Sequence, residues 1–83
     1  MKEYVATFWT HFAAMSTLRA LETAGIHAQA RPVPRDVSAS CGTCVFYLAN
    51  DVCATLLHRD FETVYEQLGE REYQAVLCND KAE

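Results

Sequence analysis

The sequence lacks the features that mark several large classes of protein. No run of apolar residues in its 83 positions approaches the roughly eighteen that a membrane-spanning helix needs. The first residues, Met1-Lys-Glu-Tyr-Val, also lack the apolar core of a signal peptide. We therefore expect no membrane partner, and a cytoplasmic protein whose 4 cysteines are reduced at rest.

Positive charge is scarce as well. The chain has 7 Lys and Arg residues against 11 Asp and Glu, for a formal net charge of −4. A nucleic-acid-binding surface is built from clustered basic side chains, so we expect no nucleic-acid partner. Apolar residues make up 51% of the chain, which is enough for one modest core. We predict a single domain over residues 1–83 with an ordered core over about residues 3–79, and fraying of the last four residues.

Only 3 glycines and 2 prolines interrupt the chain, and they help to divide its first half into elements. The predicted elements are a strand over residues 4–8, a helix from Thr10 to Ala24, a weaker strand over residues 27–31 and a strong strand over residues 44–48. Thr10 can cap the helix, and Gly25 follows it as a C-terminal stop. Pro32 and Pro34 end the weaker strand.

The second half is predicted to hold one helix and one strand. Residues 50–51 can cap a helix that extends to Leu68, where Gly69 stops it. The apolar face of this helix is formed by Cys53, Leu57, Phe61, Val64 and Leu68. Asp60 lies on the same face if the helix is unbroken, or it caps a new helix after a break; the sequence leaves both open. Residues 73–77 predict the fourth strand.

The order strand, helix, strand, strand, helix, strand is typical of a ferredoxin-like plait, an α+β fold with βαββαβ connectivity. Such a plait has a four-stranded antiparallel sheet with both helices on one face. The strands over residues 4–8 and 44–48 are then central neighbours that run in opposite directions. The end of the first strand, the start of the first helix and the loop after residue 31 would meet at one edge, which places Cys41 near His11.

The most specific stretch is Arg31-Pro-Val-Pro-Arg-Asp-Val-Ser-Ala-Ser-Cys-Gly-Thr-Cys44. It places Cys41 on a loop, where cationic neighbours such as Arg31, Arg35 and the N-terminal end of a helix favour the reactive thiolate. The groups that could bind or activate a substrate there are Arg35, Ser38, Ser40, Gly42 and His11. Glycine permits close approach of a backbone, and serines offer hydroxyl donors. The alternative is a well-packed loop whose arginines are solvated and whose nearby histidine is simply exposed.

Cys41-Gly-Thr-Cys44 has the spacing of a redox C-x-x-C pair. The usual redox pair begins a helix, whereas a strand follows here. If residues 41–44 were extended, the two Cα atoms would lie about 10 Å apart at ~3.3 Å per residue, too far for a disulfide. A tight turn at Gly42 would bring them together, so Cys44 is either a second reactive thiol or a buried one. Cys53 and Cys78 are predicted to be small buried hydrophobes.

The spacing C-x2-C-x8-C-x24-C lacks the second C-x-x-C pair that would indicate a zinc site. We therefore expect neither a metal nor another cofactor.

The segment Pro32-Val-Pro-Arg-Asp-Val-Ser-Ala-Ser-Cys-Gly42 resembles the signature of a small bacterial family of selenium/sulfur carrier-like proteins, a domain of unknown function. Thr7-Phe8 at the end of the first strand and Ala24-Gly25-Ile26 at the end of the first helix add to the resemblance, which covers about residues 4–48. The resemblance implies that Cys41 holds a persulfide or selenopersulfide, which one protein donates and another accepts. It implies a carrier more than a stand-alone enzyme.

Two other functions remain open at this point. The first is a small thiol oxidoreductase or redox sensor that uses Cys41 and Cys44. The second is a non-catalytic interaction module, in which an open sheet face carrying Tyr4, Val45 or Tyr47 pairs with a partner or, as a homodimer, with a second copy of the chain.

Overall fold

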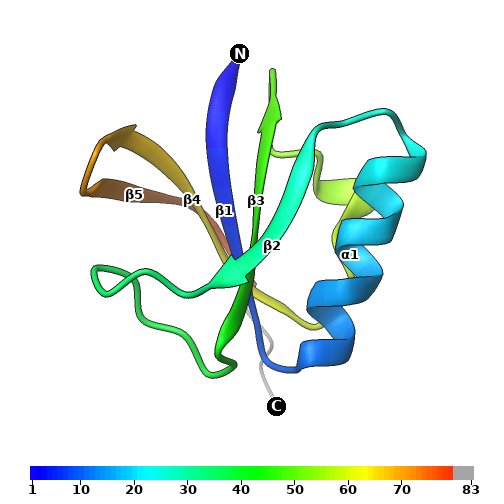
Figure 1. The fold of residues 1–83 in the computed structure, drawn as a ribbon, viewed down its shortest axis with the longest axis horizontal. Coiled ribbons are helices and arrows are strands. Elements are labelled where there is room, and N and C mark those ends of the chain that lie inside the picture. Colours follow the sequence, from blue (N-terminus) through cyan, green and yellow to red (C-terminus); the bar gives the residue numbers. More distant parts are fainter. Residues whose placement is uncertain (80–83) are drawn as a thin grey trace.

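The computed structural model describes residues 1–79, which form one antiparallel sheet with a single α-helix on one of its faces (Figure 1). The elements are β1 (Lys2–Phe8), α1 (His11–Thr23), β2 (Ala28–Pro32), β3 (Thr43–Ala49), the short 3₁₀ helix η1 (Ala54–Leu56), β4 (Phe61–Gly69) and β5 (Glu72–Cys78). The five strands follow the order β2-β3-β1-β4-β5, and every neighbouring pair is antiparallel. The fraying expected after residue 79 lies outside the described residues.

The centre of the sheet is β1, and its pairing with β3 confirms the predicted central neighbours. All five residues from Tyr4 to Phe8 are buried, so both faces of this strand are covered. Alternate residues of β1 and β3 face α1 and form the main core with it. The sheet residues of that core are Tyr4, Ala6, Phe8, Val45, Tyr47, Ala49 and Val64.

The predicted first helix is confirmed, together with its cap. The Thr10 Oγ1 atom accepts a hydrogen bond from the Ala13 N–H at 3.1 Å, which satisfies one of the donors that a helix start leaves free. Gly25 follows the helix with a φ of +82°, the left-handed conformation that favours glycine. The helix buries Ala13, Ala14, Thr17 and Leu21 against the sheet.

The ferredoxin-like plait and its second helix are wrong. Residues 50–69 form η1 and then β4, and β4 pairs with β5 as a hairpin at the edge of a five-stranded sheet. Apolar residues at intervals of three and four positions suggested one helix, but Cys53, Leu57 and Phe61 belong to different local structures. Gly69 belongs to the hairpin end of β4 rather than ending a helix. Asp60 was predicted to lie on the apolar face of this helix or to cap a new one, and both predictions are wrong because the helix is absent. The Asp60 carbonyl accepts a hydrogen bond from the Trp9 N–H at 3.1 Å.

The face of the sheet away from α1 is covered in part by the chain itself. Val5, Thr7 and Cys44 lie on this face by strand alternation, and all three are fully buried. The loop between β2 and β3 contributes Val37, which is also buried. In Figure 1 this loop and the β4–β5 hairpin lie on the opposite side of β1 from α1. The loop that carries Cys41 is therefore packed onto the sheet and the hairpin.

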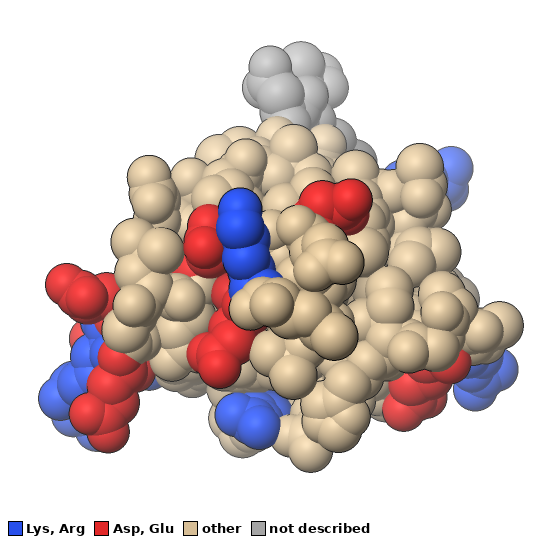
Figure 2. Space-filling model, turned by 90° about the horizontal axis from the view of Figure 1, so that it is seen from above, with Lys and Arg blue, Asp and Glu red and all other residues tan. Residues whose placement is uncertain are grey.

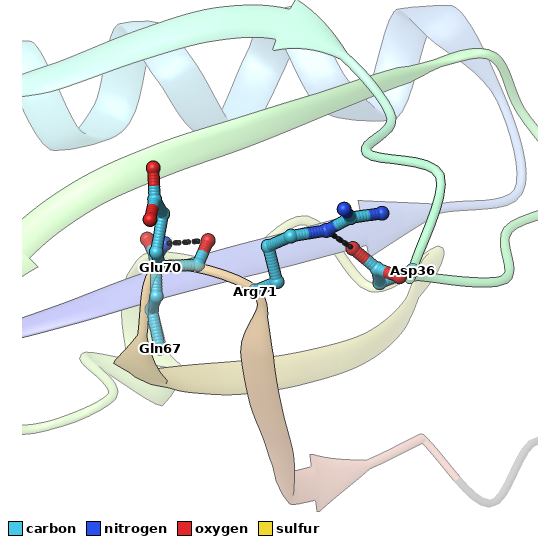
Figure 3. Close-up of polar contacts among 4 residues, drawn as sticks. All are labelled: Asp36, Gln67, Glu70 and Arg71. Atoms are coloured by element: carbon cyan, nitrogen blue, oxygen red, sulfur yellow. Dashed lines mark hydrogen bonds and ion pairs between the residues drawn. The ribbon is translucent and has the colours of Figure 1, made fainter.

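An ion pair joins the loop to the hairpin (Figure 3). Arg71 at the turn of the hairpin donates from Nε to the Asp36 Oδ2 atom at 3.2 Å. The exposed fractions of these side chains are 70% and 38%, so the pair is a surface contact and contributes little stability by itself. It shows, however, that the two segments lie against each other.

Candidate functional site

Cys41 lies on the loop between β2 and β3, and the backbone on both sides of it is held by hydrogen bonds. The preceding residue, Ser40, donates from its N–H to Glu62 Oε1 at 3.0 Å and from its hydroxyl to Glu62 Oε2 at 3.1 Å. The carbonyl of Gly42 accepts from the Val33 N–H at 3.2 Å. Cys41 itself is partly exposed, and its thiol makes no hydrogen bond within residues 1–79. The loop therefore presents a free thiol on a fixed stretch of backbone.

The start of α1 lies at the same edge of the sheet, as predicted. The His11 Nδ1 atom lies 3.2 Å from the Thr43 Oγ1 atom, a hydrogen bond whose direction depends on the tautomer of the imidazole. Thr43 is the first residue of β3 and stands two positions after Cys41. The structure thus brings His11 to the base of the loop.

Glu62 is a site residue that the sequence did not reveal. In β4, Thr63 pairs with Thr7 and Phe61 pairs with Phe8, so Glu62 is an extra residue in the ladder, a β-bulge. Such bulges often redirect a side chain beside a functional site. Because the sequence analysis predicts a helix over this segment, it does not place Glu62 beside the loop. Thr63, Val64 and Tyr65 are, however, residue types typical of strands. Recognising a strand there would have pointed to β4, but not to its bulge.

The two arginines that were expected beside Cys41 have different surroundings. Arg31 donates from Nε and Nη2 to the Gln29 Oε1 atom at 3.0 and 2.7 Å. Its guanidinium carbon lies 4.6 Å from the centre of the Phe46 ring, a cation–π contact. Arg35 is exposed and makes no hydrogen bond or ion pair within the described part of the chain. Ser40, the residue next to Cys41, is bonded to the carboxylate of Glu62. The activating role of Arg35 stays a prediction.

Cys44 is a buried thiol, as one of its two predicted roles required. Burial raises the pKa of the Cys44 thiol from 9.0 to about 11; the charge of Arg31 opposes this rise, and the charge of a Cys41 thiolate adds to it. The Cys44 Sγ donates to the carbonyls of Arg31 at 3.5 Å and Pro32 at 3.7 Å. Cys44 is therefore protonated at neutral pH. Both Cys41 and Cys44 are free thiols.

The remaining predicted residues on the loop are Ser38 and Gly42, and the contact of Gly42 is the backbone hydrogen bond with Val33. Ser38 is exposed and makes no hydrogen bond with any of residues 1–79. A Cβ atom added to Gly42 would meet no atom of the described residues within 4 Å, and the backbone of Gly42 is not in the left-handed region. The structure therefore has open space beside Gly42, and its predicted role of allowing close approach of a backbone stays a prediction.

The other two cysteines are less buried than predicted. Cys78, at the end of the edge strand β5, is exposed, so its prediction as a buried hydrophobe is wrong. Cys53 is half-buried and precedes η1 with a φ of 55°. Burial, followed by its hydrogen bond with Asp51 and the charge of Asp51, raises the pKa of Cys53. No three His, Cys, Asp or Glu side chains of residues 1–79 are grouped so as to hold a metal ion.

The sheet face proposed for an interaction module is not open. Tyr4, Val45 and Tyr47 have exposed fractions of 3%, 0% and 2%, because they pack beneath α1. The Tyr47 hydroxyl donates to the Val52 carbonyl at 2.6 Å, and burial raises the pKa of this phenol. These residues form the core and offer no surface to a partner.

The molecular surface seen in Figure 2 carries charges of both signs. Acidic and basic side chains are intermixed there, with wide uncharged areas between them. That face therefore offers no continuous basic patch. Within the described residues, no helix is both long and apolar enough to cross a bilayer.

Comparison with known proteins identifies the family. No curated protein and no solved structure matches the chain. A family model described as "Putative Se/S carrier protein-like" matches residues 3–67. The match includes β1 from Glu3 onward, α1, the loop with Cys41 and β4 as far as Gln67, and thus also Glu62. The chain therefore belongs to the Se/S carrier protein-like family.

Proposed function

We propose that the protein carries sulfur or selenium on Cys41, as a persulfide or selenopersulfide, from a donor protein to an acceptor protein. The observation that carries this proposal is the contrast between two neighbouring thiols. Cys41 is partly exposed on a loop whose backbone is held, whereas Cys44 is buried and protonated. Family membership supports the same assignment.

The chemistry needs one nucleophilic thiol and no change of net oxidation state. The Cys41 thiolate attacks the outer sulfur of a persulfide on the donor, and the donor's sulfur–sulfur bond breaks. The electron pair of that bond leaves with the donor thiolate, and Cys41 becomes a persulfide. An acceptor thiolate then attacks the outer sulfur on Cys41 and restores the Cys41 thiolate. The same exchange moves selenium when the donor holds a selenopersulfide.

Such a carrier works through protein partners and a reducing environment. Its group is transferred by direct contact between proteins, so the thiol has to be accessible, as Cys41 is. Cys41 also has to be a free thiol between transfers, which fits the bacterial cytoplasm.

Sulfur loading can be tested with a cysteine desulfurase, its cysteine substrate and the purified protein. Peptide mass spectrometry without reduction should find the added mass of one sulfur atom on the peptide that contains Cys41. The variant Cys41→Ser is the matched control and should remain unloaded. Sulfur on the Cys78 peptide, or equal loading of Cys41→Ser, would show that another thiol accepts the group.

A thiol oxidoreductase is the second candidate, because Cys41 and Cys44 are both free thiols and have the spacing of a redox C-x-x-C pair. In that function the two thiols form a disulfide, and loss of Cys44 abolishes activity. In the carrier, the variant Cys44→Ala should still be loaded on Cys41. A Cys41–Cys44 disulfide in place of a sulfur adduct would favour the oxidoreductase.

A further inference from the structure

Among residues 1–79, two polar contacts join the loop between β2 and β3 to the β4–β5 hairpin, and one of them is beside Cys41. Asp36 pairs with Arg71 near the start of the loop, as Figure 3 shows. Ser40 bonds to Glu62 near its end. The two contacts offer a comparison, because both join the same segments and only the second involves the neighbour of Cys41.

The Glu62 contact restrains Ser40 more strongly than a single hydrogen bond would. Each of the two carboxylate oxygens accepts one bond, the first from the backbone N–H and the second from the hydroxyl of the same residue. Hydrogen bonds to an ionised acceptor are roughly twice as strong as neutral ones. Because one bond involves the backbone and the other the side chain, both the path of the chain and the rotamer of Ser40 are fixed.

The position of Glu62 in the bulge explains how its side chain reaches the loop. Phe61 and Thr63 pair with the adjacent β1 residues Phe8 and Thr7, so Glu62 between them has no partner in β1. The Glu62 carbonyl still accepts a hydrogen bond from the Asn79 N–H of the chain after β5, at 3.1 Å. The Asn79 N–H therefore holds the backbone of Glu62, and the Glu62 carboxylate accepts both bonds from Ser40 at an exposed site.

We propose that Glu62 is a positioning residue, which holds Ser40 so that Cys41 is presented in one orientation to the donor protein. The proposal rests on the proposed carrier function and names a residue that controls it. Consecutive Cα atoms are about 3.8 Å apart, so a shift of Ser40 is passed directly to Cys41. Group transfer between two proteins depends on alignment of the reacting atoms, and a displacement of about 1 Å can slow a reaction by ~10²-fold.

This role predicts opposite effects of Glu62→Ala on two reactions of the same thiol. A released loop exposes Cys41, which is partly buried in the folded protein, so a small alkylating reagent should react about twofold to fivefold faster. The protein donor requires alignment, so its loading of Cys41 should become roughly fivefold to tenfold slower. A global loss of stability would also speed hydrogen exchange at the amides of the central strand β1, whereas release of the loop alone leaves that exchange unchanged.

Three further variants test the mechanism. Glu62→Gln keeps an acceptor for the Ser40 N–H and a polar partner for its hydroxyl, so both rates should return to within about twofold of wild type. Ser40→Ala removes only the hydroxyl bond and should give intermediate rates. Arg71→Ala breaks the other contact of the loop and should leave loading of Cys41 unchanged within about twofold.

The experiment measures loading by the desulfurase, alkylation by iodoacetamide with Cys78 as the internal exposed reference, and hydrogen exchange at the Ser40 amide. Exchange at Ser40 should rise in Glu62→Ala and stay near wild type in Glu62→Gln. Unchanged loading in Glu62→Ala, or an equal effect of Arg71→Ala, would overturn the proposal. If the wild type takes no sulfur, the carrier function is wrong. The positioning role is then decided by the other two measurements, and unchanged alkylation and exchange would refute it.

Discussion

Alkaline pH should destabilise the folded protein through the buried thiol of Cys44. Its pKa is raised by burial to about 11 in the folded state, against 9.0 for an ordinary thiol. Below about pH 9 the thiol is protonated in both the folded and the unfolded chain, so it has no effect on stability. Between about pH 9 and pH 11 the unfolded chain releases this proton while the folded chain keeps it. The free energy of unfolding therefore falls as the pH rises through this window.

The size of the effect follows from the displacement of the pKa. One pKa unit corresponds to about 1.4 kcal/mol, and the two-unit rise gives a loss of about 2 kcal/mol by pH 10.5. The variant Cys44→Ala has no thiol at this position and should lack this part of the loss. The variant also leaves a small cavity, but that cost is the same at both pH values. The buried phenol of Tyr47 adds an alkaline loss of its own, which is common to both proteins.

Urea unfolding at about pH 8 and about pH 10.5, followed by the fluorescence of the single tryptophan Trp9, measures both proteins. The wild type should lose about 2 kcal/mol more than Cys44→Ala between these pH values. Cys78→Ala removes an exposed thiol and should lose as much as the wild type. An equal loss in wild type and Cys44→Ala would refute the assignment of Cys44 as a buried, protonated thiol.

Three further predictions concern the loop and its thiol. Timed alkylation of the native protein at neutral pH should modify the partly exposed Cys41 and the exposed Cys78 well before the buried Cys44, and peptide mass spectrometry would reveal a different order. Arg35→Ala should slow alkylation of Cys41 without loss of folding, and an unchanged pH profile of the rate would assign Arg35 to docking or solubility instead. Gly42→Ala should change the free energy of unfolding by less than about 0.5 kcal/mol, because the added methyl group meets open space; a larger loss in a melting experiment would contradict this.

The first half of the fold could be predicted because its local signals agree with one another. Thr10 and Gly25 bound α1 in the sequence as they do in the structure. The second half could not, because residues 53–68 contain apolar side chains at helical intervals and strand-forming residues in the same window. In the folded chain, pairing of β4 with both β1 and β5 decides the conflict in favour of a strand.

The candidate site could be predicted only where it depends on chain order. The loop with Cys41 and the start of α1 meet because β1 and β3 are neighbours, which the sequence indicated. The contact with Glu62 depends on a bulge in a strand that was not recognised. The orientation of Arg31 depends on the register of β2 and β3. Arg31 pairs with Cys44, and its guanidinium group lies over the Phe46 ring of β3.

The position of β1 at the centre of the sheet has a consequence for the order in which the protein folds. Thr7 pairs with Thr63, which lies 56 positions later in the chain, whereas β4 and β5 form a local hairpin. Long-range pairing of this kind is slow, because the intervening chain must be brought together first. The loop with Cys41 is also synthesised before Glu62, which is 22 positions beyond Ser40. Until β4 has joined the sheet, the loop therefore lacks the two hydrogen bonds that Ser40 donates to Glu62.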